Sequence, residues 1–250
     1  MISELAFLTS ALAALTIFLG GIVEGYGYGL SLGTNWPYTR NIVEVAVKGD
    51  PEAIHRISAT LVGIFSLTLL LIDFNTITVI GFISVIFTAL LGMATLYVLA
   101  GKLPSIFQGF HDIAAYTTFV SYFMLGLGYD PSKFLQFLIS AIIPPHFLYF
   151  VIFMGGVVTG TRRMKLSIGE VRYPKNKLQW AWVIHGLATL IFFIALIYLR
   201  LWIALGISII EAIVGILVYM SINKNPEKPG VLIGIHQLIS IAVVISLLLS

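Results

Sequence analysis

Eight stretches of about 20 mainly apolar residues, each long enough to cross a bilayer as a helix, constrain this chain more than any other feature. They cover residues 4–24, 52–72, 76–99, 107–128, 134–159, 178–199, 201–221 and 230–249. With 59% hydrophobic and only 10% charged residues, the chain has too little polar surface for a soluble domain of its length. The sequence therefore predicts a multi-pass integral membrane protein, located in the cell membrane.

The composition also narrows the architecture and the partners. Backbone amides inside a bilayer need partners within the protein, and apolar runs this long favour a helical bundle over a β-barrel. The first stretch lacks a basic start and a cleavage site, so we interpret it as a retained helix. No cysteine is present, which excludes disulfides and thiolate-ligated cofactors. The net charge is only +3, so nucleic acid is not an expected partner.

The order of features repeats between the two halves of the chain. Each half has a glycine pair near the end of one stretch and an aromatic–proline pair in the long connection after it: Gly20-Gly21 with Trp36-Pro37, and Gly155-Gly156 with Tyr173-Pro174. A histidine-bearing stretch, a glycine-containing stretch and a second histidine-bearing stretch follow in both halves. We predict an all-α membrane protein with eight transmembrane helices, arranged as two repeated four-helix bundles in residues 1–130 and 131–250.

Four of the five histidines share one position, a turn or two inside the start of an even-numbered stretch: His55, His111, His185 and His236. Even-numbered helices of a multi-pass protein run in the same direction, so these side chains are expected at similar depth in the membrane. Paired imidazoles inside a helical bundle are typical of haem iron with two axial histidines. The sequence therefore predicts one such pair in each half.

A charged group accompanies the first histidine. Glu52, His55 and Arg56 lie on one face of a helix, at positions i, i+3 and i+4. A carboxylate one turn from a haem ligand is placed to contact the porphyrin edge, and we count Arg56 among the cofactor-binding residues. The alternative is that Glu52 caps the helix after Pro51 and pairs with Arg56. Ionisable groups in membranes are costly and usually functional, which favours the first interpretation.

Three further polar residues fall inside the apolar stretches. His146 follows a proline pair at 144–145, and we expect a structural role for it at a kink. Glu211 is deep in the seventh stretch without an evident partner, which makes it a functional candidate; a hydrogen-bonded, protonated acid is the alternative. Asp112 points away from its neighbour His111 on the helix, and we expect it to solvate the start of that helix.

Basic residues are distributed unevenly between the two sides. Most loop lysines and arginines, among them Arg162 and Arg163, lie on the histidine side, whereas the opposite side holds only Lys133 and Arg200. The positive-inside rule predicts that the histidine side faces the cytoplasm.

The first half of the chain resembles haem A synthase. That family's pattern is a glycine pair, a loop of the form Gly-Leu-Ser/Ala ending in Trp-Pro, and then Glu-x-x-His-Arg-x-x-Ala/Gly. The matching residues are Gly20-Gly21, Gly29-Leu30-Ser31, Trp36-Pro37 and the run from Glu52 to Ala59. The duplicated eight-helix layout and the four histidines match over the whole chain, although the second half retains little beyond histidines and glycines. The family's cysteine pair is absent, and the family places its histidine side outside the cytoplasm.

The resemblance implies a reaction and a role for each histidine pair. His55 and His111 would hold the haem that is modified, His185 and His236 a resident haem b, and Glu52 falls on the family's catalytic glutamate. The implied reaction oxidises a methyl group of haem O to the formyl group of haem A, by successive hydroxylations and loss of water. Haem O is then the substrate, haem O synthase and a terminal oxidase are candidate partners, and a homo-oligomer is a further option.

Two other classes of protein stay open. A non-enzymatic di-haem cytochrome b, passing electrons between a quinone and another subunit of a membrane respiratory complex, needs the same four histidines. Only the enzyme needs Glu52 beside a substrate haem. A transporter or assembly factor that binds no haem is the third option.

Overall fold

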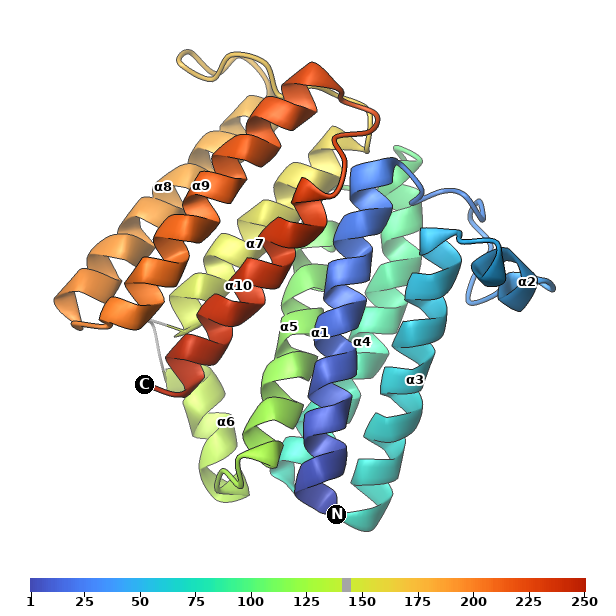
Figure 1. The fold of residues 1–250 in the computed structure, drawn as a ribbon, viewed down its shortest axis with the longest axis vertical. Helices are drawn as coiled ribbons and strands as arrows, with labels where there is room; N and C mark the ends of the chain where they lie inside the picture. The colour runs from blue at the N-terminus through green and yellow to red at the C-terminus, as the bar shows by residue number, and fades with distance from the viewer. Residues whose placement is uncertain (141–144) are drawn as a thin grey trace.

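The computed structural model describes residues 1–140 and 145–250, and all regular secondary structure in these residues is α-helical. The helices are α1 (Ile2–Tyr26), α2 (Ile42–Val47), α3 (Pro51–Ile72), α4 (Thr76–Leu99), α5 (Ile106–Gly126), α6 (Pro131–Ser140), α7 (Pro145–Arg162), α8 (Lys177–Tyr198), α9 (Trp202–Lys224) and α10 (Leu232–Leu248). Helices α1, α3, α4 and α5 run close to the long axis of the molecule, and α7, α8, α9 and α10 lie beside them at an inclination (Figure 1). The predicted all-α fold is confirmed.

Five of the described helices are long and apolar enough to cross a membrane: α1, α3, α4, α8 and α9. The pair α6 and α7 meets the same criterion only when taken together, and α10 is shorter, with 17 residues. Helix α5 is less apolar because it carries Gln108, His111 and Asp112. It packs against α1, α4 and α7, so neighbouring helices, and not lipid, surround much of its surface.

The predicted fifth stretch, 134–159, differs from the structure. It corresponds to two helices, α6 ending at Ser140 and α7 beginning at Pro145, whose directions differ by 62°. A proline fits the first turn of a helix because that turn leaves its N–H groups unpaired, and both α6 and α7 begin with one. The kink expected after Pro144 falls in residues 141–144, outside the described part of the chain.

Side-chain caps define the starts of three long helices. Asp50, Asn75 and Asn176 precede α3, α4 and α8, and each accepts a backbone N–H from the first turn that follows. At α3 the Asp50 carboxylate accepts the N–H of Ala53 at 2.9 Å, with Pro51 in the first helical position. These caps satisfy backbone donors that a helix leaves unpaired at its start.

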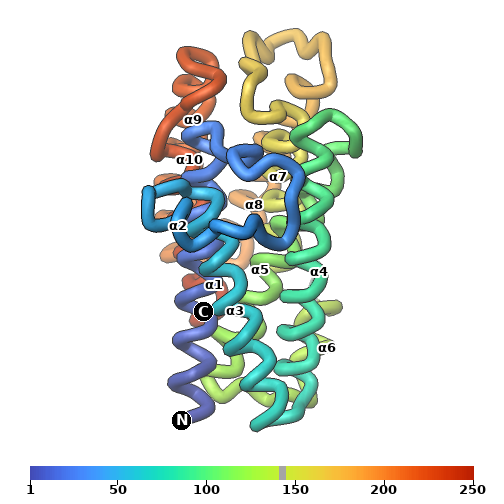
Figure 2. Tube along the Cα trace, turned by 90° about the vertical axis from the view of Figure 1, so that its right-hand side faces the viewer, coloured from blue at the N-terminus to red at the C-terminus, as the bar shows by residue number. Residues whose placement is uncertain are grey.

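Consecutive long helices pack together in both halves, but α1 packs closely against α5 in the first half, whereas α7 and α10 make little contact in the second. Helix α1 packs against α3 and α5, and α4 packs against α3 and α5; further along the chain, α7 contacts α8, α8 contacts α9, and α9 contacts α10. The closest contacts between the halves are those of α1 with α10 and of α5 with α7 (Figures 1 and 2), and α4 also contacts α6 and α7.

Glycines permit the close contacts of α1 with α10 and of α5 with α7. A Cβ atom on Gly21 would lie 2.7 Å from Cα of Gly234, and one on Gly156 would lie 2.8 Å from Cα of Gly109. Any larger residue would force these helices apart, as is common at close crossings of membrane helices. The glycine pairs that mark the repeat in the sequence therefore set equivalent helix crossings.

A buried ion pair also connects the two halves. Nε of Arg162, at the end of α7, donates to Oε1 of Glu24 in α1 at 3.1 Å, and its Nη1 donates to the carbonyl of Pro226. Arg162 is 1% exposed and Glu24 is 7% exposed. Arg162 was expected among the loop cations of the histidine side. In the structure it is the last residue of α7, and its guanidinium is paired inside the protein.

Part of the buried core lies toward one end of the bundle. Fully buried Leu69, Ile77, Tyr122, Phe134 and Leu196 all come from helix segments away from the histidines. The connections at residues 27–50, 100–105, 163–176 and 225–231 gather at the other end, at the top of Figure 1, while both chain termini lie toward the bottom. The four histidines, which lie near the starts of α3, α5, α8 and α10, are at the end where these connections gather.

Candidate functional site

The four predicted histidines have the same environment. Each ring lies against a glycine of the helix that precedes it in the bundle, in the pairs His55 with Gly20, His111 with Gly92, His185 with Gly155, and His236 with Gly215. A Cβ atom on these glycines would lie 3.2–3.4 Å from Cε1 of the ring. The absence of a side chain at each glycine lets the imidazole lie directly on the neighbouring helix.

Three of the rings are held by a backbone carbonyl four residues before that glycine. Nδ1 lies 2.9 Å from the Thr16 carbonyl oxygen in His55, and 3.0 Å from the carbonyl oxygens of Thr88 and Val151 in His111 and His185, respectively. A carbonyl can only accept, so Nδ1 carries the proton in these bonds. Nε2 is then the unprotonated nitrogen of the neutral ring, available to a metal.

The fourth ring has a different partner. Nδ1 of His236 lies 3.0 Å from Oε1 of Glu211. Glu211 is four residues before Gly215, the position whose backbone carbonyl serves the other three histidines. No partner for Glu211 was evident from the sequence, and in the structure His236 is its neighbour.

A cavity of about 520 Å³ lies between α1, α3, α4 and α5, and His55 and His111 both line it. Small-molecule and cofactor sites typically enclose about 300–1,000 Å³. Trp36, Pro37 and Tyr38 from the connection before α3 form part of its wall. Because both imidazoles line the same cavity, one group bound there can be contacted by both.

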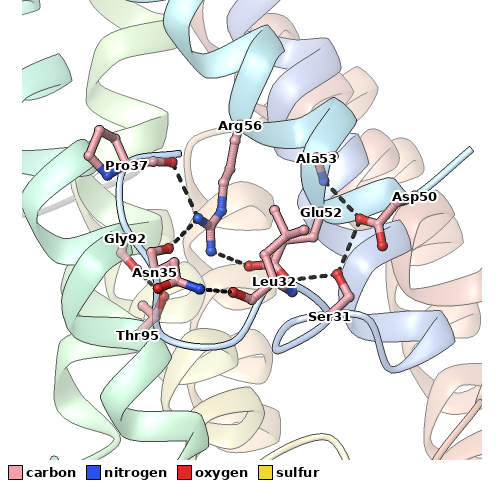
Figure 3. Close-up of polar contacts among 10 residues, drawn as sticks. All are labelled: Ser31, Leu32, Asn35, Pro37, Asp50, Glu52, Ala53, Arg56, Gly92 and Thr95. Carbon is pink, nitrogen blue, oxygen red and sulfur yellow. Dashed lines mark hydrogen bonds and ion pairs between the residues drawn. The ribbon is translucent and has the colours of Figure 1, made fainter. Parts of the chain in front are cut away.

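Glu52 also lines this cavity and is firmly held (Figure 3). Its Oε2 accepts the Ser31 hydroxyl at 2.9 Å and the Leu32 N–H at 3.2 Å, and its Oε1 accepts Nη2 of Arg56. The side chain is 4% exposed. The cap interpretation of Glu52 is wrong because Asp50 occupies that position, whereas the predicted pairing with Arg56 is present.

Arg56 connects the carboxylate to the covering loop. Its Nη1 donates to the carbonyls of Asn35 and Pro37, the two residues that flank Trp36 in the sequence (Figure 3). The guanidinium therefore holds Glu52 and the loop in one arrangement at the wall of the cavity.

Polar groups from α1, α5 and α10 complete the wall toward the second half. Asp112 accepts Nε2 of Gln108 at 3.1 Å, and both side chains line the cavity together with Glu24 and Gln237. Asp112 was expected to solvate the start of its helix, and it faces the cavity instead. One turn further along α5, the Tyr116 hydroxyl bonds to Ser240 of α10 and so reaches the other half.

The fifth histidine has a different setting. The His146 ring packs near Phe137 and Tyr149, with ring centroids 5.9 Å apart in both cases. It lies in α7, outside the repeated histidine–glycine arrangement.

The sequence could have indicated part of this geometry. A glycine in each odd-numbered apolar stretch and a histidine in the next were visible, and their pairing follows from packing consecutive helices together. The carbonyl partners carry no side-chain signal, because any residue supplies a backbone oxygen.

No protein-family model matches this chain, and no curated protein sequence matches it.

Proposed function

We propose that this protein is a multi-pass membrane enzyme of the haem A synthase type, with eight membrane-spanning helices in two repeated bundles. The His55–His111 pair holds haem O as substrate, and the His185–His236 pair holds a resident haem b. One observation carries the proposal: His55 and His111 line one cavity with Glu52, and their Nδ1 atoms are already used by backbone carbonyls.

The donor set fits haem. A porphyrin provides four nitrogens around the iron, so the protein needs to supply only axial ligands, and two imidazoles on facing helices are a common pair. Metal-bound histidines usually donate their second ring nitrogen to a carbonyl or carboxylate, and all four histidines have such a neighbour. A resident haem would supply electron transfer to the substrate site.

Glu52 is the residue placed to handle protons at the substrate. Conversion of a methyl to a formyl group requires two hydroxylations by an external oxidant, followed by loss of water, and protons leave the substrate carbon and oxygen on the way. A carboxylate at the cavity wall can accept such a proton. Its bonds to Ser31, Leu32 and Arg56 fix its position, which is what a general base requires.

The test is pigment analysis of cells that make haem O but no haem A. Expression of this protein should lead to haem A in acid–acetone extracts, separated by chromatography and identified by mass. Haem-loaded protein that leaves haem O unchanged would contradict the enzyme and favour the di-haem cytochrome b. Protein that folds in membranes without binding haem would contradict both.

Glycine substitutions in α9 should distinguish a specific effect on the second haem site from a general effect on helix packing. In Gly215→Val, the added methyl groups should push away the His236 ring, since even a Cβ would lie 3.2 Å from it. Gly206 in the same helix has nothing within 4 Å of such a Cβ, so Gly206→Val is the matched control. We expect Gly215→Val to lose the haem of the second pair, measured as Soret absorbance per chain. Equal haem content in the two variants would show that the close contact is not needed.

A further inference from the structure

Nδ1 of His236 faces the carboxyl group of a side chain, whereas Nδ1 of each of the other three histidines faces a backbone carbonyl. The residues in the equivalent position, four before the contacted glycine, are Thr16, Thr88, Val151 and Glu211. The first three present their carbonyl oxygens to Nδ1 of a histidine, at 2.9–3.0 Å. Only Glu211 presents a carboxyl group, with Oε1 3.0 Å from Nδ1.

In the described residues, neither Glu211 Oε2 nor Nδ1 of His236 has a hydrogen-bond partner. Glu211 is in the middle of α9, and its side chain is 15% exposed. Its second oxygen, Oε2, is buried, while Oε1 of Glu211 lies 3.0 Å from Nδ1 of His236. The carboxyl group is therefore directed to the imidazole alone.

A carboxyl oxygen beside Nδ1–H changes the ligand more than a carbonyl does. It draws the Nδ1 proton more strongly, which raises the electron density at Nε2 and makes the ring a more basic ligand. A more basic axial ligand stabilises ferric over ferrous iron and lowers the reduction potential. This effect is confined to the site that contains His236.

We infer that Glu211 is a positioning residue that makes His236 the strongest electron donor of the four histidines and lowers the reduction potential of the haem held with His185. The inference rests on the proposed haem binding. Its consequence is directional: an electron on the second site is favoured to pass to the first, where His55 and His111 have only carbonyl partners.

The experiment is a redox titration of the purified, haem-loaded protein at one fixed pH, followed by optical absorbance. Glu211→Gln keeps the size of the side chain and removes the carboxylate. We expect the ratio of ferrous to ferric iron at the second site to rise about tenfold at a given potential, a shift of about 59 mV for a one-electron couple. The exposed loop residue Glu227 provides the control, because Glu227→Gln makes the same change in net charge and should shift neither haem.

The possible outcomes distinguish a failure of this inference from a failure of the proposed function. If the unaltered protein binds no haem, the proposed function fails. If it binds haem and Glu211→Gln leaves both potentials unchanged, the inference is overturned while the proposed function stands. If the variant loses the second haem, the two haems of the unaltered protein are titrated instead, and the haem that is absent from His185→Ala is assigned to the second site. The inference expects that haem to have the lower reduction potential. A higher reduction potential overturns the inference.

Discussion

We expect the Glu52→Gln protein to keep its fold and its haem but to form haem A about 10²–10⁴-fold more slowly than the unaltered protein. Glutamine has nearly the same size as glutamate and keeps an oxygen for the Ser31 hydroxyl or the Leu32 N–H. It lacks the charge and the ability to take up a proton. Haem O, or a hydroxylated intermediate, should accumulate in pigment extracts from cells that make the variant.

Asp50 provides the control for this prediction. It lies two residues before Glu52 and caps α3, so Asp50→Ala should cost about 1 kcal/mol of stability and leave haem A formation intact. Undiminished haem A in Glu52→Gln would remove Glu52 from the mechanism. Equal losses of haem A in both variants, in proportion to their loss of folded protein, would assign Glu52 a structural role only.

The two histidine pairs should bind haem independently. His55 and His111 belong to α3 and α5, whereas His185 and His236 belong to α8 and α10. His185→Ala removes one ligand from the second pair and leaves the cavity with His55 and His111 unchanged. We expect this variant to lose one low-spin haem, seen as a halved α-band per chain, while the first site still accepts haem.

The fifth histidine serves as the control for the pairs. His146 is outside the histidine–glycine arrangement, so His146→Ala should retain both haems. Loss of all haem from His185→Ala, in protein that remains folded, would indicate a single shared site. Loss of haem from His146→Ala alone would mean that the ligands have been assigned to the wrong residues.

Much of the helical layout could be predicted because long apolar runs have few alternatives. The predicted stretches at 52–72 and 76–99 match α3 and α4 within a residue at each end. The fifth stretch was less predictable because hydropathy does not report direction, and α6 and α7 differ by 62° without a polar break large enough to separate them. Helix α5 was predicted as a comparable span, although its polar side chains are tolerated because other helices cover it.

At the candidate site, too, some features could be predicted from the sequence and others could not. The histidine spacing indicated that four imidazoles share a level, and the glycines they contact were visible. The partners of Nδ1 were not predictable where they are backbone carbonyls, as with Thr16 and His55. Long-range ion pairs such as Glu24 with Arg162, 138 residues apart, leave no local pattern, and neither does the cavity that side chains from several helices enclose.

The most direct test of haem binding at the paired histidines is the optical spectrum of the purified protein after expression with a supply of haem. The four histidine contacts predict a Soret band and a sharp α-band of low-spin haem, with one haem for each histidine pair by the pyridine haemochrome assay. A folded protein without these bands would contradict haem binding, and with it the proposed enzyme. A content of one haem per chain would contradict the two-site arrangement.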